Sequence, residues 1–171
     1  MTETKSPQNP TTDRPIMPDG YGVPENDNGL LPWSFVEERM IAAKNYWIGT
    51  ASSRGTPAAT PVWGAWVDGK LYFDGAPTTR RGKNISANPR VVVHLESGDE
   101  VVILEGRTVI LSGAPDRALA EKVAAAYRDK YAQFGYSPNA DQWDGGGLFI
   151  FTPKKVMGWS KFPENVTRWK F

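Results

Sequence analysis

The chain has 171 residues, of which 40% are hydrophobic and 23% charged, and a formal net charge of +1. These values are typical of a soluble globular domain with its own core, and they give no general attraction to nucleic acid or to anionic membranes. The absence of cysteine excludes disulfides, thiolate catalysis and cysteine-ligated metals. No apolar run approaches the roughly 18 residues of a membrane span. We therefore expect a cytoplasmic protein with no nucleic-acid partner and no membrane span.

Residues 1–29 are expected to form a flexible N-terminal extension. They are rich in Pro, Thr, Asp, Asn and Gly and lack apolar periodicity. The extension is not purely polar, so Ile16, Met17 and Tyr21 are candidates for docking it onto the folded body. Residues 30–171 are expected to form one globular domain.

Three helices are predicted. The first runs from Ser34 to Lys44, where Ser34 and Glu37 form a capping-box pattern. The second is short, from Arg80 to Ala87, and is ended by Pro89, because the residue before a proline disfavours helical geometry. The third runs from Asp116 to about Phe134, and its apolar face consists of Leu119, Val123, Tyr127 and Tyr131.

Strands account for most of the remaining domain. They are predicted at residues 46–52, 58–67, 70–74, 91–96, 101–111, 148–152 and 155–159. Asp68-Gly69 is a strong signal for a two-residue hairpin, and Pro61 restricts its strand to an edge position or a bulge. Because strands mostly follow strands directly, the pattern predicts a mainly β protein, a closed antiparallel barrel with a few peripheral helices.

Basic side chains and hydroxyls cluster at the start of the predicted helix 80–87. A helix N-terminus offers unpaired N–H groups and a partial positive charge, and arginine adds bidentate geometry for phosphate oxygens. The pattern indicates an anion or phosphate site, although a solvated basic loop is the alternative that these residues alone leave open. The candidate residues are Thr78, Thr79, Arg80, Arg81, Lys83 and Asn84.

Four short motifs occur in an informative order. They are Thr60-Pro61-Val62-Trp63, Leu71-Tyr72-Phe73-Asp74, Thr79-Arg80-Arg81 and Asn88-Pro89-Arg90-Val91. Their order and spacing resemble the pyridoxamine 5'-phosphate oxidase-like split-barrel family, whose members hold flavin or deazaflavin coenzymes. The resemblance extends from about Tyr46 to Trp159, with Arg81 in place of the more usual lysine. It implies an antiparallel split β-barrel, the FMN-binding split barrel, as a homodimer with the cofactor in a groove between two subunits.

The resemblance also implies a cofactor site. The isoalloxazine-like ring would lie against Pro61, Val62 and Trp63, with the backbone of that strand, which includes Thr60, at the ring edge. The phosphate would be held by the basic segment that begins at Thr78, through Thr79, Arg80, Arg81 and Lys83, with Asn84 in the same candidate set. Trp159 and Trp169 either come from the second subunit or pack as ordinary interface residues.

The chain departs from true pyridoxamine phosphate oxidases, which carry an Arg-x-His substrate motif near the C-terminus. The only histidine here is His94, in mid-strand, which argues against vitamin B6 oxidation. The ending 167–171, together with 95–99 and 104–106, looks more like the actinobacterial deazaflavin-dependent branch. The resemblance therefore implies an oxidoreductase that uses coenzyme F420 to transfer a hydride to an unsaturated small organic substrate. The alternatives are an FMN-dependent enzyme of the same fold and a non-catalytic binder of a coenzyme, haem or another tetrapyrrole.

No residue is assigned as catalytic. Water, Tyr72 and His94 are the candidate proton donors, and His94 is open to three interpretations, as a hydrogen-bonded structural residue, a proton donor or a haem ligand. The sequence has no His, Asp or Glu spacing typical of zinc and no nucleophile elbow. We expect no metal site.

Overall fold

The structure is a computed structural model, described for residues 9–171. Within these residues nine strands form one sheet: β1 (Thr11–Asp13), β2 (Tyr46–Ala51), β3 (Pro57–Val62), β4 (Ala65–Val67), β5 (Lys70–Asp74), β6 (Arg90–His94), β7 (Val101–Ile110), β8 (Leu148–Trp159) and β9 (Thr167–Lys170). The helical elements are α1 (Ser34–Ala42), α2 (Arg80–Ala87), α3 (Arg117–Tyr131) and the 3-10 turns η1 (Ala132–Phe134) and η2 (Ala140–Trp143). None of the helices in residues 9–171 is long and apolar enough to cross a membrane.

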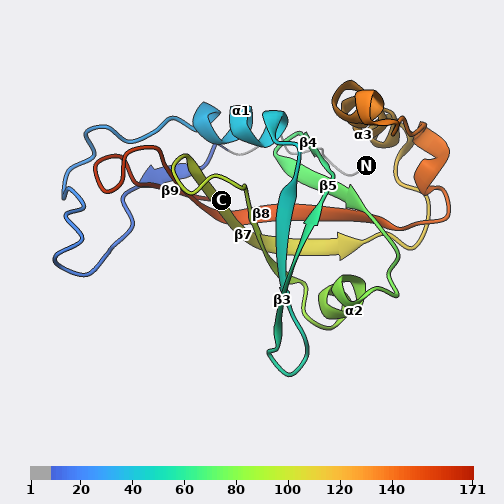
Figure 1. Ribbon diagram of the computed structural model, residues 1–171, viewed down its shortest axis with the longest axis horizontal. Coiled ribbons are helices and arrows are strands. Elements are labelled where there is room, and N and C mark those ends of the chain that lie inside the picture. The colour runs from blue at the N-terminus through green and yellow to red at the C-terminus, as the bar shows by residue number, and fades with distance from the viewer. Residues whose placement is uncertain (1–8) are drawn as a thin grey trace.

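The sheet closes into a split barrel, which confirms the predicted fold (Figure 1). β2 pairs with β3 and β6, β6 with β7, β7 with β8, β8 with β5, and β5 with β4, all antiparallel. β3 runs on into β4 through Trp63 and Gly64, and β4 pairs only with β5. The ring of strands is therefore closed by chain continuity at one place and by hydrogen bonds elsewhere.

Two predicted strand boundaries are corrected. The single strand predicted at 58–67 is divided into β3 and β4 at Gly64, where an added Cβ would lie 2.9 Å from the carbonyl oxygen of Tyr72. The two strands predicted at 148–152 and 155–159 form one strand, β8, whose register against β7 shifts between Glu105 and Gly106. The edge position predicted for Pro61 is confirmed, because among the described strands β3 pairs with β2 alone.

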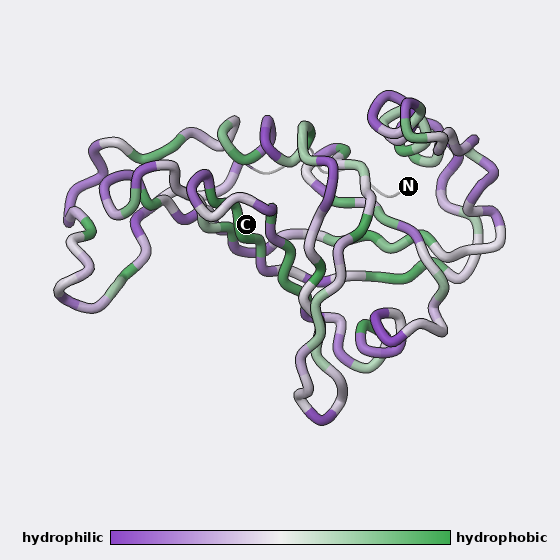
Figure 2. The backbone as a smooth tube through the Cα atoms, viewed as in Figure 1, coloured by the Kyte–Doolittle hydropathy of each residue, from purple (hydrophilic) through white to green (hydrophobic). Residues whose placement is uncertain are grey.

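Two apolar clusters stabilise the barrel, and hydrophobic stretches follow much of the barrel strands (Figure 2). The first fills the interior and includes Ile48, Phe73, Leu104 and Trp169, all fully buried. The second lies between the outer side of β4 and β5 and helix α3, and it contains Tyr72, Val123, Tyr127, Tyr131, Trp143 and Leu148. The predicted apolar face of α3 is confirmed, with Leu119 at its margin.

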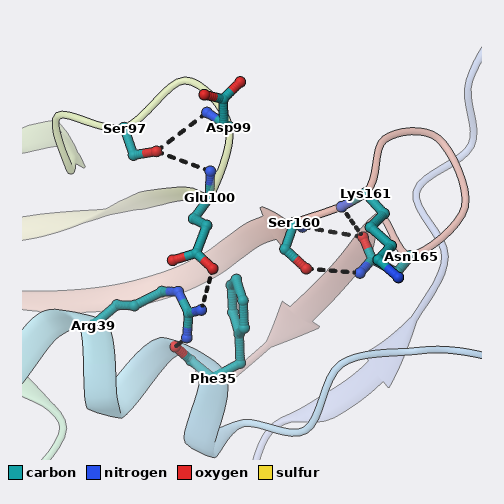
Figure 3. A network of polar contacts seen from close by, with 8 residues as sticks. All are labelled: Phe35, Arg39, Ser97, Asp99, Glu100, Ser160, Lys161 and Asn165. Atoms are coloured by element: carbon teal, nitrogen blue, oxygen red, sulfur yellow. Dashed lines mark hydrogen bonds and ion pairs between the residues drawn. The ribbon is translucent and has the colours of Figure 1, made fainter.

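Helix α1 closes one end of the barrel, but not with the expected cap. Its N-cap is Trp33 and makes no side-chain cap bond, so Ser34 is already the first helical residue, one position too late to cap. A polar network instead ties α1 to the turn after β6 (Figure 3). Arg39 forms an ion pair with Glu100 at 2.9 Å, and its guanidinium lies 3.6 Å from the ring centre of Phe35.

The segment expected to be a flexible extension is partly bound to the domain. β1 pairs with β9, and Asp13 forms ion pairs with Arg168 at 2.8 Å and Lys170 at 2.7 Å. These two cations hold the pKa of Asp13 at about 2, chiefly through the hydrogen bond from Arg168. Docking thus runs through β1, and the expected anchor Tyr21 packs edge-on against Phe162 with ring centres 6.4 Å apart, whereas Ile16 is 93% exposed. Residues 1–8 lie outside the described part of the chain.

Helix α3 is fixed to the split in the barrel by a lysine. Lys130 Nζ donates to Ala43 O at 2.9 Å, to the hydroxyl of Tyr46 at 2.7 Å and to Gly64 O at 3.4 Å. Tyr131 donates to Lys44 O at 2.8 Å and accepts from Gly64 N at 3.0 Å. Burial lowers the pKa of Lys130 from 10.5 to about 8, because the charged form loses hydration there.

This lysine predicts a measurable pH dependence of stability. Between pH 8 and 10.5 the unfolded chain binds a proton at Lys130 that the folded chain releases, so this group's contribution to the free energy of unfolding rises with pH in that window. Lys130→Met removes this contribution. The stability difference, wild type minus variant, should therefore grow between pH 7.5 and pH 10 in urea unfolding. Parallel pH profiles for the two proteins would contradict this assignment.

Candidate functional site

A groove with a volume of about 870 Å³ lies on the outer face of the barrel, across β3, β2, β6 and β7. Its floor on β2 and β3 is made of small residues, namely Gly49, Ala51 and Ala59. Cross-strand pairing sets Gly49 beside both Ala59 and Val92. The groove is therefore hollow because its floor residues lack large side chains.

Four cationic side chains line the same groove, namely Arg90, Arg107, Lys154 and Lys155. One acidic residue, Glu105, also lines it and forms an ion pair with Lys155 at 2.7 Å. The register shift between Glu105 and Gly106 leaves Lys154 without a partner residue on β7. Such a bulge redirects side chains, and here both lysines line the groove.

Only glycine fits at position 106. An added Cβ would collide with the carbonyl oxygen of Thr152 and lie 2.7 Å from the ring of Phe151. The absence of a side chain at Gly106 thus lets β7 and β8 approach closely next to the bulge, and this bulge shapes the cationic side of the groove.

The N-terminus of α2 adjoins the β3 edge of the groove. Thr79 is the N-cap: its hydroxyl accepts from Gly82 N at 3.1 Å and donates to Ala76 O at 2.8 Å. Arg80 Nη2 donates to Pro57 O at 3.4 Å, and Pro57 is a groove residue. Of the predicted phosphate-binding residues, Arg80 is the one that the structure brings to the groove.

Some of the other predicted anion-site residues are exposed to solvent, and others point toward the barrel. Thr78 and Lys83 are exposed. Asn84 is buried and donates to Thr50 Oγ1 at 3.0 Å, so its amide holds α2 on the barrel. Arg81 also turns inward, near the rings of Phe73 and Phe149, and burial lowers the pKa of its guanidinium. Asn84 and Arg81 therefore lie on the inward side of α2, because the helix needs such a face to pack.

The four predicted ring contacts also point in different directions. Thr60 pairs with the fully buried Ile48, and Val62 packs against the interior cluster. Trp63 stacks on Tyr131, with ring centres 4.7 Å apart, on the α3 side. Pro61 takes the alternate face, as successive strand residues do. The side chains of Val62 and Trp63 are thus not on the face that carries the groove.

A histidine and a tryptophan lie next to Pro61 on this outer face. Trp47 pairs with both Pro61 and His94, and the rings of Trp47 and His94 are parallel within 2° with centres 6.2 Å apart. His94 Nδ1 lies 2.9 Å from Leu95 O, so Nδ1–H donates and the lone pair belongs to Nε2. Nε2 makes no hydrogen bond with residues 9–171.

The other residues considered for chemistry lie elsewhere. Tyr72 is 3% exposed in the cluster under α3 and does not line the groove, and burial raises its pKa to about 12. Trp169 is fully buried in the interior cluster and cannot extend to a second subunit. Residues 9–171 contain no group of three or more His, Asp or Glu side chains placed to hold a metal ion.

Several groove residues were not found from the sequence. Arg107, Lys154 and Lys155 come from two strands that are separated by α3 in the chain, and only the register of β7 with β8 brings them together. The available signal was the spacing of Glu105 and Arg107, which are two residues apart in a predicted strand and therefore lie on the same face.

Comparison with solved structures shows the same fold at low sequence identity. A haem-binding protein from Mycobacterium smegmatis matches with a TM-score of 0.61 and 16% identity over 82% of this chain. A FAD-binding protein from Mesorhizobium loti matches with a TM-score of 0.57 and 20% identity, covering 82% of this chain and 95% of that one. An F420 reductase matches with a TM-score of 0.52 and 19% identity, covering 70% and 94%.

The matched part covers only 59% of the length of the M. smegmatis protein. No curated protein matches the sequence.

The family comparison agrees with the fold. Residues 36–159 match the family described as Pyridoxamine 5'-phosphate oxidase, and this range includes the barrel strands β2 to β8, helix α2 and the groove. The chain belongs to the pyridoxamine 5'-phosphate oxidase family.

Proposed function

We propose that this protein is an oxidoreductase that binds a phosphate-bearing flavin-class coenzyme, F420 in preference to FMN, in the groove. It transfers a hydride from the reduced coenzyme to an unsaturated small organic substrate. The observation that carries this proposal is the combination of a hollow floor of small residues with four cationic side chains along the same groove. Family membership and the F420 reductase and FAD-binding structures support it.

The groove fits such a coenzyme in size and charge. Its volume of about 870 Å³ is within the range of roughly 300–1,000 Å³ common for small-molecule sites. Glu105 neutralises Lys155, which leaves three cationic side chains in the groove for anionic groups of a ligand. Arg80 at the N-terminus of α2 adds a fourth at the rim, where the backbone N–H groups of the first turn also favour an anion.

In this proposal the residues of the chain bind and orient the coenzyme. The small floor residues admit a flat ring, and Pro61 and Trp47 extend the same face with apolar surface. Arg80 and the groove cations hold anionic groups and so fix the ring along the groove. The bound reduced coenzyme supplies the hydride. Of the two side chains considered as proton donors, His94 lies beside this apolar surface, whereas Tyr72 is buried under α3.

F420 is preferred over FMN because of charge. A deazaflavin coenzyme carries a lactyl-oligoglutamate beyond its phosphate, whereas FMN ends at the phosphate. The cationic residues of the groove come from β6, β7 and β8, a wider spread than a single phosphate group requires. Local cationic surface of this kind lowers the free energy of binding for the more anionic ligand.

A second candidate function is the binding of haem or another tetrapyrrole without turnover. The observation that favours it is His94, whose Nδ1 is engaged by Leu95 O, an arrangement that leaves Nε2 available to a metal carried by a macrocycle. The similarity to a haem-binding protein supports it.

The groove is open on one side, and family resemblance implies that a second copy of the chain covers it. We expect a homodimer at micromolar concentration in light scattering, since the exposed Val92 and Val109 lie on the outer faces of β6 and β7. A strict monomer under these conditions, with or without coenzyme, would count against a groove shared by two subunits.

Removal of Arg80 should weaken coenzyme binding. Charged hydrogen bonds contribute roughly 1.5–3 kcal/mol each, so Arg80→Ala should raise the dissociation constant about tenfold or more in calorimetric titration and reduce its salt dependence. Arg117→Ala is the matched control, because Arg117 lies on α3 in an exposed ion pair with Glu121. Equal affinities for both variants would show that the anion binds elsewhere.

Coenzyme choice can be tested by parallel titrations with F420, FMN and haemin. We expect the tightest binding for F420, with oxidation of the reduced coenzyme only when an unsaturated acceptor is present. Tight FMN binding with peroxide production would favour the FMN alternative. A Soret shift with haemin that His94→Ala abolishes, without flavin binding, would favour the tetrapyrrole candidate.

A further inference from the structure

Two arginines stand directly opposite each other on the groove face. Arg90 of β6 and Arg107 of β7 are cross-strand partners in the antiparallel register. Both are exposed and both line the groove. Directly opposed residues on one face of a sheet have Cβ atoms about 4.5–5.5 Å apart, and like charges in that position destabilise the sheet.

No acidic residue between positions 9 and 171 relieves this repulsion. Within residues 9–171 neither guanidinium forms an ion pair or a side-chain hydrogen bond. The acid nearest in register is Glu105, which lies on β7 two residues before Arg107 and opposite Val92. Its carboxylate is engaged by Lys155 at 2.7 Å. The arginine pair is thus an unneutralised cationic position in a hollow part of the surface.

We propose that Arg90 and Arg107 together hold a single oxyanion, a carboxylate or phosphate group of the ligand, between their two guanidinium groups. Guanidinium is suited to this because it presents paired N–H donors in the spacing of a carboxylate or phosphate. A bound anion converts the repulsion between the two arginines into two attractive contacts. The pair therefore lowers the stability of the free protein and contributes affinity when an anion is bound.

This oxyanion position is separate from the N-terminus of α2. Arg80 begins that helix, whereas Arg90 follows its C-terminal end at Ala87. A helix of eight residues is about 12 Å long, so the two positions suit two anionic groups of one ligand. The inference rests on the proposed function in taking the groove as the coenzyme site. It adds the ligand class to that function, namely a molecule that carries a second oxyanion beyond its first phosphate.

The test uses thermal unfolding of the full chain in a chloride buffer. Arg107→Gln should raise the midpoint temperature of the protein without added oxyanion, because it removes the repulsion. A γ-linked triglutamate peptide and inorganic phosphate serve as separate probes for a carboxylate and a phosphate source. Either probe that occupies the site should raise the midpoint of the wild type, and Arg107→Gln should lose that rise, with binding weakened about tenfold or more in calorimetry.

Two controls make the result specific. Arg90→Gln should reproduce both effects, whereas Arg117→Gln, on the remote helix α3, should leave the response to the probes unchanged. The inference is overturned if neither probe stabilises the wild type, or if Arg107→Gln and Arg90→Gln respond as the wild type does. If both variants also bind F420 with wild-type affinity, this inference fails while the proposed function stands. If no coenzyme binds but the variants lose the probe response, the proposed function fails and the oxyanion site stands.

Discussion

The rest of the structure depends on the pairing of β8 with its three neighbours. This strand of 12 residues pairs with β5 near its start, with β7 along nearly its whole length and with β9 near its end. The first pairing closes the barrel, and the last anchors β9 and, through it, β1. The bulge between these two regions directs Lys154 and Lys155 into the groove. One strand thus joins the core, the N-terminal segment and the cationic side of the candidate site.

The candidate site combines features that sheet stability alone would not favour. Small residues on β2 and β3 make few side-chain contacts on the outer face, and two arginines face each other across β6 and β7. By contrast, the side under α3 is filled by Tyr127, Tyr131 and Trp143 and contains hydrogen bonds to Trp63 O and Tyr72 O. This difference between the two sides of one barrel is consistent with the ligand site proposed for the groove face.

The sequence predicted the elements that depend on local patterns. Asp68-Gly69 forms the expected hairpin with positive φ at both residues, and α2 has the predicted bounds because Thr79 caps it and Pro89 follows it. The features that were missed depend on contacts between distant segments. β1 pairs with a strand more than 150 residues later, and Arg107 meets Arg90 only through the register of β6 with β7. Neither relation leaves a periodic signal in the sequence.

Helix α2 shows how a polar segment can be fixed firmly and still leave a cationic side chain at the rim of the groove. Spacing alone grouped Arg80, Arg81, Lys83 and Asn84 as one cluster, but a helix resting on a barrel must direct part of each turn inward. Asn84 and Arg81 take that side: the amide bonds Thr50, and the guanidinium donates to Asp74 O at 3.4 Å beside two aromatic rings. Their polar contacts hold the helix, and Ile85 adds apolar contact with the interior cluster. Arg80 is thereby left to meet the groove at Pro57, on a helix whose position is already determined by its other face.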